Sequence, residues 1–271
     1  MEFVDTHCHI HEAATDEIGD QFMHDKWLNA GISDPQELID AAAKADVHTL
    51  ICVGCSLHDS QMALALAQKY PHCWASMGIH PHEAKDHLEP KVHKAFKRLL
   101  SQPKVVAIGE CGLDYYYSHS PKADQIKLLE FQLGLAEQHN LPVIFHIREA
   151  FKDFWPIFDT YKGLRGVVHS FSSNQSDLDN ILSRGLFVGL NGITTFTKSQ
   201  EQLEAVKKIP LDRLLLETDA PFLTPVPYRG KVGEPKYVRV VAEFLAHLRR
   251  EPLELLANVT TNNALGLFNL R

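Results

Sequence analysis

Short apolar runs alternate along the chain with segments in which apolar residues recur at helical spacing. Eight of these runs have the length and the aliphatic, β-branched composition of buried strands. They cover residues 2–7, 48–54, 73–79, 104–110, 142–147, 165–170, 186–192 and 213–219. Amphipathic segments such as 34–45 and 60–70 lie between the runs and are typical of helices. The pattern predicts a strand followed by a helix, repeated along the chain.

This repeat favours an α/β fold, a (β/α)8 TIM barrel that carries its chemistry at the C-terminal ends of the strands. A doubly wound parallel sheet is the alternative. The chain has 271 residues, a usual length for one such barrel, and no linker divides it, so we expect a single domain over residues 1–271. Residues 10–33 separate the first strand from its helix by far more than the roughly two to six residues of a usual connection, which predicts a lid-like insertion.

Charge and cysteine content narrow the class of protein. The chain has 27 basic and 34 acidic residues and a net charge of −7, which argues against a broad basic face for gripping long nucleic acid. Its five cysteines are scattered and odd in number, so they predict no disulfide framework. No run is long enough to span a membrane and no signal peptide is evident. We expect a cytoplasmic protein with no membrane association and no obligate protein partner.

Polar side chains close most of the predicted strands at the end where a barrel carries its chemistry. They are His7, His9, His80, Glu110, His146, His169 and Asp219. Side chains alternate along an extended segment, so His7 and His9 share one face. Imidazole and carboxylate groups are ligands of divalent metals, and the set therefore predicts a metal centre. A polar barrel interior is the alternative interpretation.

Several segments that contain these residues resemble one known family. They read DTHCH (5–9), GIHPHE (78–83), AIGECGLDYY (107–116), LPVIFHIREA (141–150), VVHSFSS (167–173) and LLLETDAPFLTP (214–225). Together they resemble the TatD family of metal-dependent deoxyribonucleases, within the amidohydrolase superfamily, from residue 3 to about residue 268. The resemblance implies a barrel that holds two divalent ions at the strand ends.

The resemblance also implies a ligand set. His7 and His9 would bind one ion together with Glu110 and Asp219, and Glu110 would bridge to a second ion held by His146 and His169. The residues near this set carry weaker expectations. Cys8 would face the helices, His11 would lie outside the ligand shell or in solvent, and Asp5 would be placed to orient a ligand imidazole.

The sequence departs from the family pattern in two motifs that bear on the substrate. Val232 and Gly233 replace the basic residue and the asparagine that usually precede Glu-Pro, although Arg229 and Lys231 remain as candidate substrate contacts. Ser170 and Ser172-Ser173 replace the cysteine and glycine that usually flank the phenylalanine after the strand-six histidine. These changes concern substrate preference more than metal binding.

The mechanism that we expect is hydrolysis of DNA ends by a metal-activated water. We expect these ends to be single-stranded. As in the family, the reaction would be that of a 3′→5′ exodeoxyribonuclease. Glu110 would act as the bridging ligand, and Asp219 would take the proton of the water or orient it. His80 either donates to the leaving oxygen or binds a phosphate, or it packs at the mouth. A histidine-rich ligand set favours Zn or Mn, whereas the family implies Mg.

Two further features suggest contacts with a substrate. Arg148 lies two residues beyond His146 and suits a bidentate phosphate contact, or it pairs with Glu149 or Asp153. The three tyrosines 115–117 either stack on bases or, for at least one of them, pack under the loop.

A second hypothesis keeps the site and changes the bond. Metal-activated water also attacks carbonyl carbons, so an esterase or amidase such as a D-aminoacyl-tRNA deacylase is the alternative function. A non-catalytic scaffold is disfavoured because no ligand is missing from the set.

Overall fold

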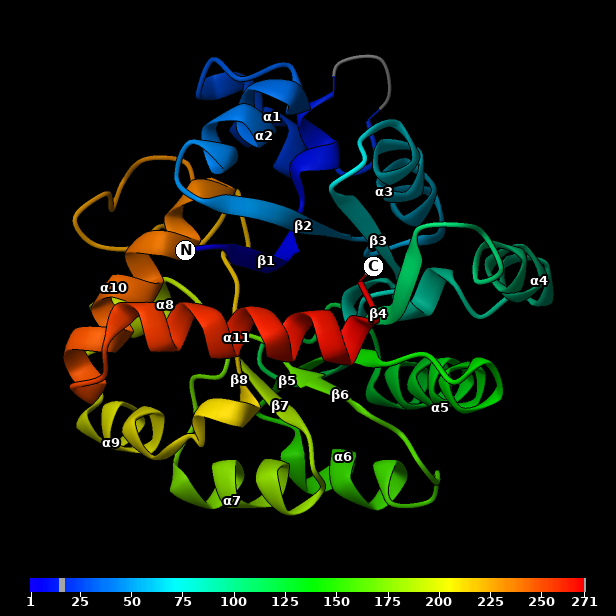
Figure 1. Cartoon of the computed structure of the whole chain (residues 1–271). Coiled ribbons are helices and arrows are strands. Elements are labelled where there is room, and N and C mark those ends of the chain that lie inside the picture. The colour runs from blue at the N-terminus through cyan, green and yellow to red at the C-terminus, as the bar shows by residue number, and fades with distance from the viewer. Residues whose placement is uncertain (15–17, 271) are drawn as a thin grey trace. The chain divides into compact units, whose positions relative to one another are not determined.

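The computed structural model describes residues 1–14 and 18–270 (Figure 1). Its strands are β1 (Phe3–Cys8), β2 (Val47–Val53), β3 (Cys73–Met77), β4 (Val105–Asp114), β5 (Val143–Arg148), β6 (Gly166–Val168), β7 (Phe187–Leu190) and β8 (Leu214–Leu216). Its α-helices are α1 (Gln21–Asn29), α2 (Pro35–Ala43), α3 (Leu57–Lys69), α4 (Pro90–Leu99), α5 (Lys122–His139), α6 (Phe151–Phe158), α7 (Gln175–Ser183), α8 (Ile193–Phe196), α9 (Gln200–Lys208), α10 (Val238–Arg249) and α11 (Leu253–Phe268). Four short 3-10 helices are η1 (Ile10–Ala13), η2 (Pro81–Asp86), η3 (Leu211–Arg213) and η4 (Pro235–Tyr237).

The strand order distinguishes the two folds that the sequence left open. The eight strands follow one another in the sheet in the order of the chain, from β1 to β8. The last strand also returns to the first, because Cys8 at the end of β1 forms a parallel bridge with Ala220, just beyond β8. A doubly wound sheet has a shuffled strand order instead. The prediction of a (β/α)8 barrel is therefore confirmed.

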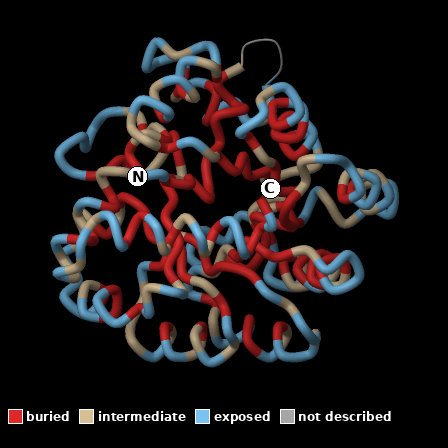
Figure 2. The backbone as a smooth tube through the Cα atoms, in the orientation of Figure 1, coloured by how far each residue is buried: buried red, intermediate tan, exposed pale blue. Residues whose placement is uncertain are grey.

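The chain comprises two compact units, each of which contains different strands and helices. Unit 1 comprises residues 1–52 and 170–271, and in it β1 pairs in parallel with β2 and β7 with β8. Helix α11, drawn in red in Figure 1, packs against β1 and β8. Every residue of β1 is buried, and Figure 2 draws this strand in red. Unit 1 thus places the first and last strands side by side under one helix.

Unit 2 comprises residues 53–169 and holds β3 to β6 with α3 to α6. Its strands pair in parallel in chain order. Helix α3 begins where the sequence provides a cap, since Ser56 accepts a hydrogen bond from the backbone N–H of Asp59. Asp34 caps α2 of unit 1 in the same way, through the N–H of Gln36.

Two strands differ from the sequence prediction in a way that matters for the site. β4 extends to Asp114, beyond the predicted end at residue 110, because the strand continues through Gly112. β8 has only three residues and ends at Leu216, so Asp219 lies in the segment after the strand.

Of residues 10–33, residues 10–13 and 21–29 form short helices rather than an irregular connection. Within them the chain folds into η1 and α1, and Trp27 of α1 is completely buried, with its indole N–H donating to the carbonyl oxygen of His9 at 3.3 Å. Glu12 is buried as well and accepts hydrogen bonds from the N–H groups of Gly19 and Asp20. Residues 15–17 of the predicted insertion lie outside the described residues. Its lid-like role stays a prediction.

No helix in the described part of the chain combines the length and the apolar character needed to cross a bilayer.

Candidate metal centre

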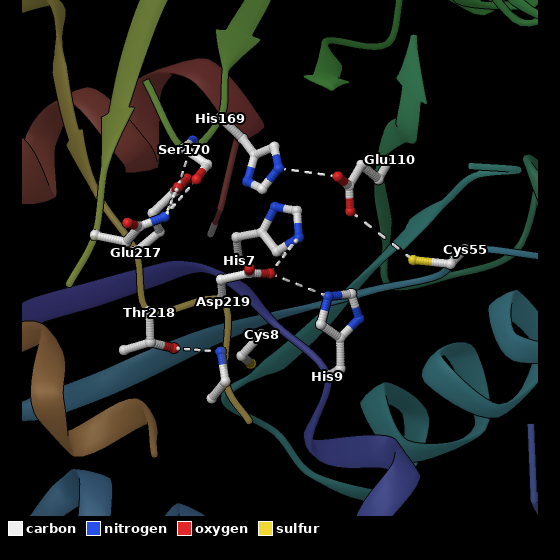
Figure 3. Close-up of polar contacts among 12 residues, drawn as sticks. His7, Cys8, His9, Cys55, Glu110, His169, Ser170, Glu217, Thr218 and Asp219 are labelled. Atoms are coloured by element: carbon white, nitrogen blue, oxygen red, sulfur yellow. Dashed lines mark hydrogen bonds and ion pairs between the residues drawn. The ribbon is translucent and has the colours of Figure 1, made fainter. Parts of the chain in front are cut away.

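Unit 1 brings three of the predicted ligands together. The Nε2 atoms of His7 and His9 lie 3.5 and 3.4 Å from Oδ1 of Asp219 (Figure 3). The backbone holds these residues in register, because the N–H of Asp219 donates to the carbonyl oxygen of His7 at 2.8 Å. Asp219 itself has a left-handed backbone with φ of 61°, a conformation that non-glycine residues rarely adopt. Its position therefore depends on the contacts that surround it.

Asp5 contacts Thr218, the residue that precedes Asp219. This fully buried carboxylate accepts hydrogen bonds from the N–H of Thr218 at 2.9 Å and from its hydroxyl group at 2.5 Å. It also accepts one from the backbone N–H of His7 at 3.2 Å. Burial raises the pKa of Asp5 to about 8, against the lowering effect of these hydrogen bonds. The expectation that Asp5 orients a ligand imidazole is replaced by a different role, since Asp5 fixes the backbone next to Asp219.

The neighbours of His7 and His9 along the chain are both buried. Cys8 is fully buried, and its thiol lies 3.5 Å from the carbonyl oxygen of Ile51. His11 is buried, with its ring centroid 6.0 Å from that of His9. It therefore lies beside a predicted ligand rather than in solvent.

Unit 2 gathers three imidazoles around one carboxylate oxygen. Oε1 of Glu110 lies 2.6 Å from Nδ1 of His146, 2.9 Å from Nε2 of His169 and 3.5 Å from Nε2 of His80. Its second oxygen, Oε2, accepts a hydrogen bond from the thiol of Cys55 at 3.8 Å (Figure 3). Sequence reasoning placed Glu110, His146 and His169 in the site but did not include Cys55.

Asp114 is the important residue that sequence reasoning missed. Its Oδ2 lies 3.0 Å from Nε2 of His146 and 2.9 Å from Nε2 of His82. Its Oδ1 accepts hydrogen bonds from the N–H groups of Tyr116 and Tyr117, each at 2.9 Å. Strand alternation offers the signal that was overlooked, because residues 110, 112 and 114 share one face once β4 is taken to run through the glycines. A buried carboxylate therefore orients a predicted ligand imidazole.

These hydrogen bonds shift the pKa values of Asp114 and His146. Burial alone would raise the pKa of Asp114, but the hydrogen bonds from His146, His82 and the N–H of Tyr117 lower it well below its usual range. Burial alone would lower the pKa of His146, and the hydrogen bonds to Asp114 and Glu110 raise it overall. Asp114 is therefore ionised, and it stabilises a proton on Nε2 of His146.

His80 has its tautomer fixed by the backbone. Its Nδ1 accepts a hydrogen bond from the N–H of His82 at 3.1 Å, so in the neutral ring the proton resides on Nε2. Burial, followed by the nearby His146, lowers the pKa of His80 to about 4. At neutral pH His80 is thus a neutral imidazole that presents an N–H donor toward Glu110.

Gly112 allows β4 and β5 to approach each other next to a predicted ligand. It pairs with His146 across the two strands. A Cβ atom at position 112 would lie 1.8 Å from the carbonyl oxygen of His146, far inside contact distance. Only glycine fits at this point of the strand.

The spacing of the donor atoms of unit 1 fits a metal ion. Ligand atoms about 2.0–2.1 Å from a tetrahedral zinc ion lie about 3.3–3.4 Å from one another. The separations of 3.4 and 3.5 Å between Asp219 and its two histidines match this spacing, and they exceed the roughly 2.7–3.2 Å of an N–H···O hydrogen bond. In unit 2, His80, Glu110 and His146 bring one ligand atom each within 4.8 Å of one another. Buried imidazole and carboxylate donors of this kind suit a divalent transition metal.

The predicted substrate contacts lie on the surface. Arg148, at the end of β5, stacks on two tyrosines and, among the described residues, forms no ion pair with Glu149 or Asp153. Arg229 is exposed and lies 3.8 Å above the ring of Phe196, while one of its N–H groups donates to a backbone carbonyl oxygen. Lys231 is exposed as well.

The serine that departs from the family pattern takes part in a buried network of unit 1. The N–H of Ser170 donates to Oε1 of Glu217 at 2.7 Å, and the side-chain amide of Asn191 donates to both residues at 3.0 Å (Figure 3). Ser170 is thus a hydrogen-bonding residue in this chain.

Comparison with known proteins decides the family. The family described as TatD related DNase matches residues 4–269. The chain belongs to the TatD family. A relative from Bacillus subtilis, named "Uncharacterized metal-dependent hydrolase YabD", is 37% identical over 240 residues, which cover 88% of this chain and 94% of the relative. This member of the TatD family is accordingly a metal-dependent hydrolase.

Other relatives extend the comparison to function and fold. The "3'-5' ssDNA/RNA exonuclease TatD" of Salmonella typhimurium is 35% identical over 245 residues, covering 88% of this chain and 94% of the relative. The crystal structure of YJJV, a TatD homologue from Escherichia coli K12, is 30% identical, covers 98% of both chains and superposes with a TM-score of 0.85. The phosphotriesterase homology protein of Escherichia coli, 14% identical with a TM-score of 0.69, shares the fold. The barrel and the family prediction from sequence are therefore confirmed.

Proposed function

We propose that this TatD-family hydrolase removes nucleotides from the 3′ ends of single-stranded DNA, with residues 1–271 acting as one catalytic domain. The observation that carries the proposal is the complete set of predicted ligands in a chain 35% identical to a 3′-5′ ssDNA/RNA exonuclease. The buried carboxylate–imidazole clusters of the two units support it.

The ligand assignment is also a proposal and rests on the family resemblance. His7, His9 and Asp219 would hold one divalent ion, and His146 and His169 the second, with Glu110 bridging. The donor chemistry suits Zn or Mn, and Mg is the alternative that the family implies.

A bound divalent ion lowers the pKa of a water molecule from 15.7 to about 7 in favourable cases, which supplies a nucleophile at neutral pH. The residues of the chain do the rest. Asp219, whose side chain is 17% exposed, accepts or directs the proton of the attacking water. His80 donates a hydrogen bond from Nε2–H to the leaving oxygen, a role that its fixed tautomer supports. Arg148, Arg229 and Lys231 contact substrate phosphates.

A second candidate function is hydrolysis of an ester or amide, as in a D-aminoacyl-tRNA deacylase. The observation that favours it is the pair Val232 and Gly233, which takes the place of two polar family residues in the loop after β8. Loss of those side chains alters the substrate site and leaves the ligand residues intact.

The test is turnover of a 5′-labelled single-stranded oligonucleotide by chelator-treated protein, with Mg, Mn and Zn added back separately. We expect a ladder that shortens from the 3′ end, no product without metal, and none from the Glu110→Ala variant. Glu130→Ala, at an exposed position of α5, is the matched control and should cleave like the wild type. Cleavage that survives Glu110→Ala would refute the proposal. In a parallel assay on an aminoacyl-tRNA, release of the aminoacyl group without loss of terminal nucleotides would favour the second candidate.

A further inference from the structure

Two exposed aromatic rings follow β4 beside the predicted ligands of unit 2. Tyr116 and Tyr117 are 55% and 50% exposed, which is unusual for large aromatic side chains. Tyr115 differs from both, because its hydroxyl donates to Asp153 at 3.0 Å and the ammonium group of Lys122 lies 3.7 Å from its ring centroid. Tyr115 therefore packs against the protein, while the next two rings are presented to solvent.

A guanidinium group lies over both exposed rings. The Cζ atom of Arg148 is 4.3 Å from the ring centroid of Tyr116 and 4.7 Å from that of Tyr117. Throughout the part of the chain that the structure describes, no carboxylate forms an ion pair with the guanidinium of Arg148, although Asp114 is its register partner across the two strands. Its positive charge is thus held in place by aromatic rings and remains free to attract a phosphate.

One carboxylate fixes the backbone of the two exposed tyrosines relative to a predicted ligand. Oδ1 of Asp114 accepts hydrogen bonds from the backbone N–H groups of both tyrosines, and its Oδ2 is hydrogen-bonded to Nε2 of His146. Arg148 pairs with Asp114 across β4 and β5, two positions beyond the pair of Gly112 and His146. The rings and the guanidinium are therefore positioned by the same strands as the ligand.

Two histidine rings continue the aromatic surface toward the site. The ring of His119 is exposed and nearly parallel to that of Tyr117, with an interplanar angle of 10° and centroids 5.8 Å apart. The ring centroid of His82 lies 4.5 Å from that of His119 and 4.3 Å from that of His80. Aromatic rings thus extend without a break from solvent to the group that faces Glu110.

We infer that Tyr116, Tyr117 and Arg148 form a stacking platform for the bases of single-stranded nucleic acid, with the guanidinium near a backbone phosphate. This inference rests on the proposed function and names the part of the chain that holds the substrate. Stacking on aromatic rings accepts any base, because every base has a π face. The platform therefore gives preference for unpaired strands without sequence preference, which suits a chain of net charge −7 that has no broad basic face.

The test measures binding separately from cleavage. A fluorescently labelled single-stranded oligonucleotide and the same oligonucleotide with abasic sites at its 3′ end are titrated with chelator-treated protein, and anisotropy gives both dissociation constants. We expect the wild type to prefer the base-containing strand by about tenfold or more and the Tyr116→Leu/Tyr117→Leu double variant to lose this preference. The Tyr116→Phe/Tyr117→Phe variant, which keeps both rings, should retain it.

Tyr70→Leu is the matched control. Tyr70 is half-buried and precedes β3, at the end of that strand remote from His80, so this variant should behave like the wild type. Equal preference for the base-containing strand in the wild type and in the double Leu variant would overturn the inference. If the wild type discriminates between the strands but cleaves neither, the proposed function fails and the platform stands. If it cleaves the oligonucleotide without discrimination, the platform fails and the proposed function stands.

Discussion

Asp114 lies 3.0 Å from Nε2 of His146, and the other nitrogen of that ring faces Glu110 at 2.6 Å. A carboxylate on one side of an imidazole fixes its tautomer and its orientation, so that the opposite nitrogen is directed at a metal. Asp114 therefore acts on a proposed ion through His146 and is a positioning residue.

The Asp114→Asn variant tests this role. Asparagine can still accept the backbone N–H groups of the following turn, but it lacks the negative charge that holds the proton on His146. We expect metal affinity to fall by about 10- to 100-fold, measured by competition with a chromophoric chelator. Asp86→Asn, at an exposed position of η2, should bind metal like the wild type. Unaltered affinity in Asp114→Asn would show that the carboxylate does not orient the ligand.

Gly112→Ala should destabilise the fold strongly. The new Cβ atom would collide with the backbone carbonyl oxygen of His146, which cannot move without displacing β5. We expect the free energy of unfolding to fall by at least about 3 kcal/mol, measured by urea denaturation of chelator-treated protein. Gly134→Ala in α5 is the control. Its nearest neighbouring atom is 4.0 Å away, and alanine there should stabilise the helix by up to about 1 kcal/mol. Similar effects at both positions would contradict the steric argument.

Thr218→Val keeps the shape of the side chain but removes the hydroxyl group that donates a hydrogen bond to the buried Asp5 side chain. The buried carboxyl group of Asp5 then loses a hydrogen-bond donor and the N–H of Ala220 loses an acceptor, so we expect a loss of about 1–3 kcal/mol in the free energy of unfolding. Thr160→Val, at an exposed hydroxyl, should change it by less than about 0.5 kcal/mol. A result for Thr218→Val as small as that of the control would mean that the hydrogen bond to Asp5 contributes nothing to stability.

His93 gives the stability a pH dependence of known sign. Its ring stacks on Phe131 with centroids 3.7 Å apart, and partial burial lowers the pKa of His93 below its usual 6.5. The unfolded chain therefore binds a proton at this residue first as the pH falls, so the stability that neutral His93 provides is lost below about pH 6.5. In urea titrations, the wild type should lose stability relative to His93→Leu between pH 7.5 and pH 5.5. An equal difference at both pH values would exclude this linkage.

Hydrophobic periodicity was sufficient for the fold. All eight strands lie where apolar runs predicted them, and the ends that carry histidine or carboxylate residues were found because the runs stop there. The predicted run ended at Glu110, whereas the strand continues through Gly112, which marks a close approach of β4 to β5, as far as Asp114. Asp114 was missed because it lies four residues beyond the predicted end of this strand.

The hydrogen bonds of Asp5 with Thr218 could not be predicted from the sequence either. Alternation placed it on the same side as His7, but its partner Thr218 is 213 residues away along the chain. Pairings over such distances depend on tertiary structure, which local patterns do not encode. The tautomer of His80 was hidden similarly, because it is set by a backbone N–H group whose direction is known only from the folded chain.

The bond between Asp5 and Thr218 has a consequence for biosynthesis. At about 5–20 residues per second, a ribosome needs on the order of 10–40 s to add the 213 residues that separate them. Throughout that time His7 and His9 are present on the nascent polypeptide without the carboxylate of Asp219. The unit 1 cluster therefore cannot assemble before residue 219 has been added, so that binding of the proposed ion there follows synthesis of all eight strands rather than guiding it.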